Sequence, residues 1–261
     1  MSRSPQVLTL TTDFGYRDHY VGAMKGVVAS LAPGVRVCDI THDVPSFDIA
    51  EGAFAIAQAW RFYPAGTVHA VVVDPGVGSS RAPMAAAAGG HLFVAPDNGV
   101  LSHVLELVGT FSLRRIAARH GLGTLSRTFH GRDLFAPVAA RLAAGLPFGD
   151  VGPRLARPVR LAPLAVADGR GCVLHVDRFG NIVTNFRPSD LGAGTGLAVG
   201  GTVVGLRADS YAEAPRHELF LILGSSGYVE ISVNQGSAAA ELQVKAGSSV
   251  TRSRLPGSCE Q

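Results

Sequence analysis

The chain has 261 residues, 47% of them hydrophobic and 16% charged, so it can bury a large core and disorder is not expected. The net charge of +3 comes from scattered Arg side chains with only two Lys, which argues against a nucleic-acid partner. The N-terminal residues lead straight into a strand pattern, and no run of about 18 apolar residues occurs. We therefore expect a soluble, cytoplasmic protein with no membrane partner.

The cysteine pattern also favours a cytoplasmic protein. Cys38, Cys172 and Cys259 stand apart, with no C-x-x-C pair. This pattern is typical of a reducing compartment and argues against structural zinc.

The first half of the chain alternates between strand and helix patterns. Strands are predicted over 7–12, 35–40, 67–73 and 91–94, and helices over 20–31, 49–62, 99–107 and 133–144. The strands are short and almost continuously apolar, which is typical of a mostly parallel sheet flanked by helices on both faces. The sequence therefore predicts an α/β N-terminal domain over residues 1–155.

The second half of the chain has a different pattern. Residues 152–168 hold three prolines without periodicity, and we place a linker over 156–168. Short strands separated by Gly, Ser, Asn and Asp follow over 172–176, 182–186, 202–206, 219–223, 228–233 and 241–244, with no helical stretch. We predict a smaller all-β C-terminal domain over 169–261, as a barrel or sandwich.

Polar residues follow each predicted strand of the N-terminal sheet, where ligands of open α/β sheets bind. In chain order they are Asp13, with Asp18 five residues on, His42 with Asp43, Asp74, and Asp97 with Asn98. Asp is also common in turns and at helix N-caps, and that alternative stays open for Asp43 and Asp97. For Asp13 and Asp74 we favour a functional role, because each directly follows an apolar run and is followed by a Gly within two residues.

Other segments allow more than one interpretation. His130, in Thr128–Asp133 (TFHGRD), lies just before a predicted helix, although loop histidines are often surface groups. Residues 179–181 (Phe-Gly-Asn) fit a simple hairpin turn between two strands. Gly76–Arg81 (GVGSSR) lacks the third Gly of a dinucleotide fingerprint. A metal site built from Asp13, Asp97, His130 and Asp133 also stays open.

Taken in order, several motifs resemble the S-adenosyl-L-methionine (SAM) hydroxide adenosyltransferases, also called SAM hydrolases, which are relatives of the fluorinating and chlorinating enzymes. The resemblance covers nearly the whole chain, and ordered motifs are far more specific than any single one. The motifs are LTTDFG at 10–15, YRDHYVGAMKG at 16–26, DPGVGSSR at 74–81, PDNGVLS at 96–102, TFHGRD at 128–133, DRFGNIVTN at 177–185 and GSSGYVEISVNQGSAA at 224–239.

The resemblance implies a reaction and an assembly. Water or hydroxide attacks C5′ of the ribose and displaces L-methionine, leaving adenosine. The implied fold is an N-terminal α/β domain with a C-terminal β-barrel. The implied assembly is a homotrimer in which the substrate lies between the N-domain of one subunit and the C-domain of its neighbour. No cofactor and no metal are expected.

The family's catalytic residues map onto Asp74, Arg81 and His130. Arg81 is permanently charged, so it can stabilise hydroxide character on a bound water and hold Asp74 ionised. Asp74 can orient that water toward C5′, and His130 can relay or accept the proton. Which of these two groups takes the proton is left open by the sequence.

The resemblance also assigns binding roles. Asp13 is expected at the ribose diol, and Asn181 at the adenine edge. The other expected contacts are Asp18, Asp177 and Ser225 at the methionine end, and Phe179 and Tyr211 beside the base. Glu230 alternates with apolar residues on a predicted strand, so it is placed on the polar face and is a weaker candidate.

One departure separates the subfamilies. The halogenating relatives have Tyr where Asp74 stands and lack the Asp, Arg and His set. A carboxylate at position 74 would repel halide, so water is the expected nucleophile. The alternatives are a halide-dependent halogenase and a non-catalytic SAM- or adenosine-binding module.

Overall fold

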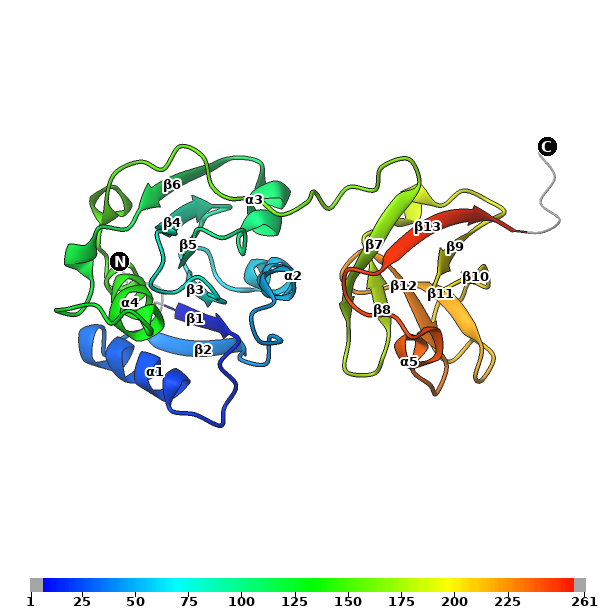
Figure 1. Cartoon of the computed structure of the whole chain (residues 1–261), viewed down its shortest axis with the longest axis horizontal. Coiled ribbons are helices and arrows are strands. Elements are labelled where there is room, and N and C mark those ends of the chain that lie inside the picture. The colour runs from blue at the N-terminus through cyan, green and yellow to red at the C-terminus, as the bar shows by residue number, and fades with distance from the viewer. Residues whose placement is uncertain (1–6, 256–261) are drawn as a thin grey trace. The chain divides into compact units, whose positions relative to one another are not determined.

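The computed structural model describes residues 7–255 and divides the chain into two compact units between Pro163 and Leu164 (Figure 1). This division falls within the predicted linker, residues 156–168. The exact limits of the two domains, 1–155 and 169–261, remain predictions. Cys259 lies outside the described residues. No helix in the range 7–255 is long and apolar enough to cross a membrane.

The N-terminal unit is built on a six-stranded sheet with the order β2-β1-β3-β5-β4-β6. Its strands are β1 Val7–Thr12, β2 Arg36–Thr41, β3 Val68–Val72, β4 Pro83–Ala88, β5 His91–Pro96 and β6 Phe111–Arg115. β1 and β3 are completely buried and rich in β-branched residues, as expected for central strands.

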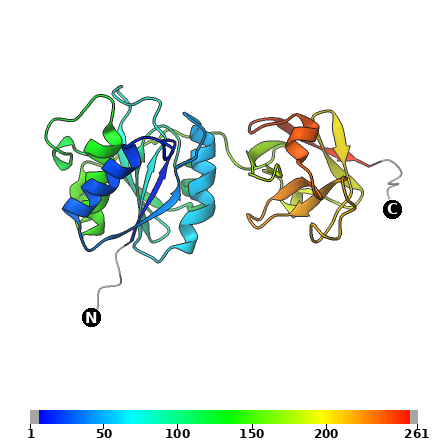
Figure 2. The same cartoon turned by 90° about the horizontal axis from the view of Figure 1, so that it is seen from below.

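Helices cover both faces of this sheet (Figure 2). α1 Tyr20–Leu31 and α4 Ala136–Ala143 pack on one face, where Met24 and Val28 join a core with Leu8, Leu10 and Phe135. α2 Ile49–Ala59 and α3 Ser102–Val108 pack on the other face. Short 3₁₀ turns occupy Trp60–Phe62, Ala118–His120 and Phe148–Val151, and a π-helical turn, Gly131–Phe135, precedes α4.

The prediction of a mostly parallel sheet is correct for β2, β1, β3 and β5 but needs a correction, because the sheet is mixed. β4 runs antiparallel to both of its neighbours, β5 and β6. Neither β4 nor β6 was expected from the sequence. The residues of β4, Pro-Met-Ala-Ala-Ala-Ala, lack the β-branched side chains that mark a strand, and pairing with two neighbours overrides this weak preference.

The C-terminal unit is a seven-stranded antiparallel sheet with the order β10-β9-β13-β7-β8-β12-β11. Its strands are β7 Arg170–Val176, β8 Ile182–Thr184, β9 Thr195–Val199, β10 Thr202–Val204, β11 Leu219–Leu223, β12 Val229–Val233 and β13 Ser249–Arg254. The segment after β10 bonds to Leu221 of β11, through Leu221 N–H to Leu206 O at 2.8 Å and Ala208 N–H to Leu221 O at 3.1 Å. These bonds bring the two ends of the sheet together, so the unit is a nearly closed barrel.

Three details of the barrel correct the sequence prediction. Residues 241–244 do not form a strand, because Ala238–Leu242 form the short helix α5. Ser237 caps this helix by accepting from Ala240 N–H at 3.1 Å, and the helix consists of good helix formers. A 3₁₀ turn, Pro188–Asp190, adds a second helical element, and strands β9 and β13 were not anticipated.

Candidate active site

The turn after β3 folds back on itself, so that Arg81 returns to Asp74. Asp74 O accepts Val77 N–H at 3.2 Å, and Gly76 O accepts Ser79 N–H at 3.1 Å. Gly78 has a φ of 77°, and a Cβ there would lie 2.3 Å from the carbonyl oxygen of Arg127. Only glycine therefore fits at this bend.

Asp74 and Arg81 form a buried, bidentate ion pair. Arg81 Nε donates to Asp74 Oδ1 at 2.8 Å, and Arg81 Nη2 donates to Asp74 Oδ2. The side chains are only 5% and 9% exposed, respectively. A fork-to-carboxylate pair at this depth has one preferred geometry, so the two groups hold each other in place.

His130 completes the group, and its hydrogen bond defines its tautomer. Arg81 Nη2 lies 2.8 Å from His130 Nδ1. A guanidinium can only donate, so Nδ1 accepts and the neutral ring carries its proton on Nε2. Burial and the neighbouring Arg81 charge lower the pKa of His130 below 6.5, which favours this neutral form.

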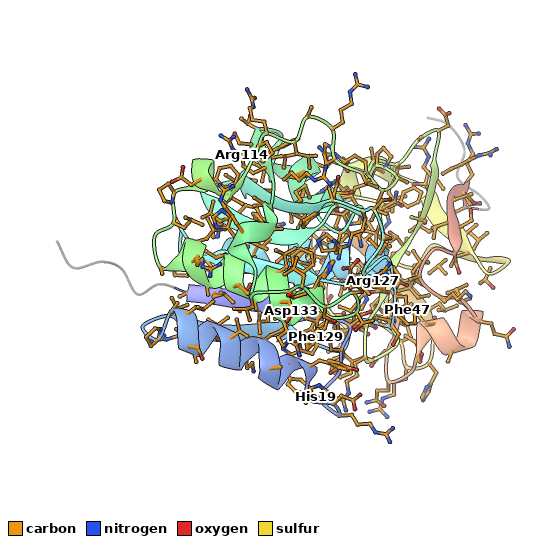
Figure 3. All side chains as sticks on the ribbon, turned by 60° about the vertical axis from the view of Figure 1, so that its left-hand side comes forward. His19, Phe47, Arg114, Arg127, Phe129 and Asp133 are labelled. Carbon is orange, nitrogen blue, oxygen red and sulfur yellow. The ribbon has the colours of Figure 1, made fainter. Side chains whose placement is uncertain are left out.

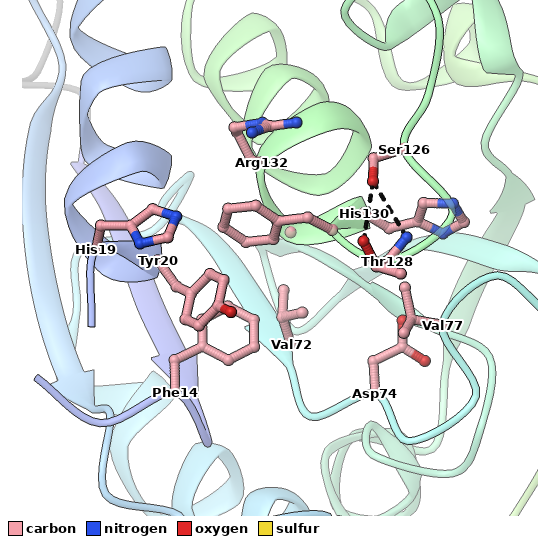
Figure 4. A pocket seen from close by; sticks show the side chains of 12 residues that line it. Phe14, His19, Tyr20, Val72, Asp74, Val77, Ser126, Thr128, His130 and Arg132 are labelled. Atoms are coloured by element: carbon pink, nitrogen blue, oxygen red, sulfur yellow. Dashed lines mark hydrogen bonds between the residues drawn. The ribbon is translucent and has the colours of Figure 1, made fainter. Parts of the chain in front are cut away.

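A pocket of about 340 Å³ opens beside this group (Figure 4). Phe14 and Tyr20 line one side, and Asp74, Val77 and His130 line the opposite side. The ring of Phe129 packs edge-on against both aromatic rings, at 5.9 Å from Phe14 and 4.9 Å from Tyr20. The pocket thus combines an apolar wall with a charged one, as small-molecule sites commonly do.

A second cavity, of about 520 Å³, lies on the other side of the same group. Arg81 and His130 line it together with Ser79, Ser80 and Arg115. His130 therefore borders both cavities, whereas Asp74 borders only the first.

The π-helical turn before α4 places His130. Asp133 is buried, and its carboxylate accepts from Ser126 N–H at 2.8 Å and from Arg132 Nε at 2.6 Å. Burial acts to raise the pKa of Asp133, but these donors outweigh it and hold the pKa below 3.8. Phe129 and Asp133 lie close to α1 in Figure 3, and His130 is the residue that directly precedes the turn.

Asp13 and Asp18, both expected at the substrate, have different surroundings. Asp13 follows β1 and is partly buried, and its Oδ2 accepts Phe47 N–H at 2.9 Å. Asp18 is exposed and does not line the pocket, although its neighbours His19 and Tyr20 do.

In the C-terminal unit, Asp177 organises the β7–β8 hairpin loop. Its Oδ1 accepts the N–H groups of Phe179 and Asn181 at 2.8 and 2.9 Å, and its Oδ2 accepts from Asn181 Nδ2 at 2.8 Å. Gly180 has a φ of 86° and packs directly on Ser237. The hairpin interpretation of this segment is confirmed. Most of the hydrogen bonds that the Asp177 carboxylate can accept come from its own loop.

Four of the expected binding residues border one cavity of the C-terminal unit. Asp177, Phe179, Asn181 and Tyr211 line a cavity of about 550 Å³, together with residues 233–236. Phe179 is 77% exposed, so its ring is open to a ligand. Ser225, in the turn between β11 and β12, is exposed and does not border this cavity.

Glu230 lies on the strand face opposite the core-facing residues of β12, as predicted, but this polar face is buried. Every residue of β12 is buried, including Glu230 and Ser232. Tyr211 donates its hydroxyl to Glu230 Oε2 at 3.1 Å, and burial raises the pKa of Glu230 above 4.5. Glu230 therefore lies behind Tyr211 and holds its hydroxyl.

The alternative metal set does not come together. Asp97 accepts Val159 N–H at 2.8 Å, and Asp133 is paired with Arg132 and Ser126. Within the part of the chain that the structure describes, no group of three or more His, Cys, Asp or Glu is placed to hold a metal ion. The Asp97 carboxylate instead holds the backbone of a segment 62 residues further along the chain and does not cap α3.

Some pocket residues were not anticipated from the sequence. Phe14, His19, Tyr20, Ser126, Thr128 and Arg132 line the pocket and were not named as site residues. Phe47 was also missed: it is 70% exposed, has a φ of 70° and donates its N–H to Asp13. An aromatic residue held in the left-handed region marks a constrained loop, but nothing in its sequence context signals that conformation.

Comparison with known proteins matches the whole arrangement to one family. Residues 8–152 match the model of the SAM hydroxide adenosyltransferase N-terminal domain, and residues 171–251 match that of its C-terminal domain. The chain is 42% identical to an (R)-S-adenosyl-L-methionine hydrolase of Salinispora tropica, over 92% of this chain and 95% of the relative. It is 40% identical to a protein of the same name from Thermus thermophilus, over 90% of this chain and 95% of that relative.

More distant and structural relatives agree. A fluorinase of an Actinoplanes species is 29% identical, over 94% of this chain and 96% of the relative. The crystal structure of an uncharacterized conserved protein from Thermotoga maritima superposes with a TM-score of 0.88 at 36% identity, covering 94% of this chain and all of the other. The chain therefore belongs to the SAM hydroxide adenosyltransferase family.

Proposed function

We propose that the protein hydrolyses SAM to adenosine and L-methionine by attack of water on C5′ of the ribose. The observation that carries this proposal is the buried group formed by Asp74, Arg81 and His130, with Asp74 and His130 in the charged wall of an otherwise aromatic pocket. The sulfonium is a good leaving group, so the protein's task is to position and activate water rather than to protonate sulfur.

In the proposed mechanism Asp74 takes the proton. Because Arg81 occupies Nδ1 of His130 and Nε2 already carries a proton, the neutral ring has no free lone pair to accept another. Each oxygen of Asp74 retains acceptor capacity beyond its bond to Arg81. The water oxygen bonds to C5′ as the C5′–S bond breaks. The electron pair of the broken bond stays on the sulfur of methionine, and the attacking water gives a proton to Asp74. Arg81 stabilises hydroxide character, and His130 holds Arg81.

The proposed substrate contacts follow the family resemblance. Asp13 holds the ribose diol, and Asp18, Asp177 and Ser225 meet the methionine end. Phe179 and Tyr211 pack beside adenine, with Glu230 supporting Tyr211. Asn181 has one amide N–H committed to Asp177, which leaves the other N–H and its carbonyl for the adenine edge.

A product assay tests the proposal. Purified protein is incubated with each sulfonium epimer of SAM separately, because the relatives named above are (R)-S-adenosyl-L-methionine hydrolases. Chromatography should show adenosine and methionine in equal amounts, and adenosine no higher than in an enzyme-free blank would rule the function out. Asp74→Ala should lose most turnover while still binding SAM, whereas loss of binding would make Asp74 a substrate ligand.

Two other functions make different predictions in the same assay. A halogenase would form 5′-halo-adenosine when chloride or fluoride is supplied, but the carboxylate at position 74 disfavours an anion there. A non-catalytic binding module would bind SAM in calorimetry without turnover over hours. The fluorinase relatives are less similar than the hydrolases, which also favours hydrolysis.

We also propose a homotrimer that places each substrate between the N-terminal unit of one subunit and the C-terminal unit of the next. The expected binding residues are divided between the two units, which supports such sharing. Light scattering after size exclusion should give three times the 27.1 kDa chain mass. A cytoplasmic location is supported by the unpaired Cys38 and Cys172.

A further inference from the structure

A chain of polar contacts joins the end of β1 to the end of β2, beside the pocket. Thr12 Oγ1 lies 2.8 Å from His42 Nδ1, and Phe14 N–H donates to the same Thr12 oxygen at 3.2 Å. Thr12 is fully buried and His42 is 1% exposed. None of the roles described above uses either side chain.

Asp39 anchors the far end of this chain. His42 Nε2 lies 3.2 Å from Asp39 Oδ1, a close polar contact that is not aligned as a hydrogen bond. Lys25 Nζ and the Tyr16 hydroxyl donate to Asp39 Oδ2 at 2.6 and 3.0 Å. Burial acts to raise the pKa of Asp39, but these donors and His42 outweigh it and hold the pKa below 3.8, so the group is a carboxylate at neutral pH.

The carboxylate sets the direction of the hydrogen bonds. A negative charge beside Nε2 favours the His42 tautomer that carries its proton there. Nδ1 then accepts the Thr12 hydroxyl, and the Thr12 oxygen accepts Phe14 N–H. The chain therefore runs without conflict from the backbone of Phe14 to Asp39.

A local irregularity in the sheet produces this arrangement. Leu10 pairs with Asp39 but Thr11 pairs with Thr41, so β2 holds one extra residue, Ile40, at this point. Such a bulge re-aims side chains, and bulges are over-represented beside active sites.

The backbone that this chain holds carries substrate-facing groups. Asp13 lies between Thr12 and Phe14, and Phe14 forms part of the aromatic wall of the pocket. Gly15 N–H donates to His42 O at 2.8 Å, and the Tyr16 ring packs edge-on against the His42 ring at 5.0 Å. His42 therefore touches the turn after β1 through its side chain, its ring face and its carbonyl.

We propose that His42 and Thr12 are positioning residues for substrate binding, which hold the turn after β1 so that Asp13 meets the ribose diol and Phe14 completes the pocket wall. The inference rests on the proposed function for the identity of the diol. It assigns no chemical step to His42, because the imidazole is separated from the pocket by the turn that it holds.

The proposal predicts an effect on KM rather than on kcat, since a ribose contact is made equally in the ground and transition states. Thr12→Val keeps the shape of the side chain but removes its hydroxyl. It should raise the KM for SAM about tenfold, the effect of losing one hydrogen bond between the ribose and the Asp13 carboxylate. The kcat should stay within about threefold of wild type. His42→Ala should do the same. His42→Asn, which places a carbonyl oxygen where Nδ1 lies, should restore most of the KM, and His42→Gln should not.

A matched control separates positioning from general destabilisation. His69 is also a fully buried histidine of the same sheet, but it bonds to Thr9 at 2.7 Å and His91 at 3.1 Å rather than to the pocket loop. His69→Asn should lower the melting temperature and leave KM unchanged. A KM for Thr12→Val within twofold of wild type, an equal rise in His69→Asn, or a His42→Asn variant no better than His42→Ala would overturn the proposal.

A second measurement does not depend on turnover. Calorimetry compares adenosine with 2′-deoxyadenosine, which lacks one diol hydroxyl, on wild type and Thr12→Val. The preference for adenosine should shrink about tenfold in the variant, and an unchanged preference would contradict the inference. If wild type fails to hydrolyse SAM, the proposed function is wrong, but this preference still tests the placement of Asp13.

Discussion

Replacing Arg81 by lysine tests whether the geometry of the guanidinium, rather than its charge alone, supports catalysis. Arg81 makes three hydrogen bonds with two nitrogens, two to Asp74 and one to His130. The single nitrogen of Lys cannot span both carboxylate oxygens and the imidazole at once. At least two of the three bonds should be lost, and each bond to a charged group is worth about 1.5–3 kcal/mol.

Not all of that energy is expressed in the transition state. Removing one hydrogen-bond donor that stabilises the transition state in other enzymes lowers kcat about 10²–10³-fold. We expect Arg81→Lys to have an effect of this size on kcat and a smaller effect on KM. Steady-state adenosine release measures both constants. Arg61→Lys, at an exposed site in the 3₁₀ turn after α2, serves as the matched control and should leave both constants unchanged.

A second variant separates charge from shape. Arg81→Met leaves the buried Asp74 carboxylate without a cation, which should lower the free energy of unfolding by about 3–5 kcal/mol, whereas Arg81→Lys should lower it less. Urea unfolding at pH 7 gives this comparison. An Arg81→Lys enzyme that keeps more than a tenth of the wild-type kcat would refute the view that catalysis requires the guanidinium geometry of Arg81.

Further predictions concern protonation and the turn. Because burial and Arg81 hold the pKa of His130 below 6.5, kcat should decline only as the pH falls below this value; loss on raising the pH from 6 to 7 would contradict the neutral assignment. Burial and His91 lower the pKa of His69 to about 3 in the folded protein. As the pH falls below 6.5, the unfolded chain takes up a proton at His69 that the folded protein does not, so the free energy of unfolding decreases. Urea unfolding should show His69 contributing about 3 kcal/mol to the loss between pH 7 and pH 4, and an equal loss in His69→Asn would exclude it. Gly78→Ala should reduce both kcat and melting temperature, because its Cβ would meet the Arg127 carbonyl at 2.3 Å; unchanged values would mean that the turn can relax.

The local pattern of the sequence was enough for the central strands and the main helices. β1, α1 and β11 have the predicted bounds, since buried apolar runs and helical spacing are properties of neighbouring residues. β4 was missed because its Ala-rich residues have little strand preference, and both β4 and β6 are held by pairing with neighbouring strands. The 241–244 segment was misassigned because one cap at Ser237 decides its conformation.

The sequence by itself determined the family, the order of its motifs and the residue types available for chemistry. It also placed carboxylates after the parallel strands, because strand ends can be read from a one-dimensional pattern. Only the tertiary structure decided what those groups touch. Arg81 bonds His130 across 49 residues of chain and thereby assigns its tautomer, Asp177 turns its carboxylate into its own loop, and a bulge at Ile40 joins His42 to Thr12. Hydrogen-bond partners depend on distance and direction in space, and neither is carried by residue order.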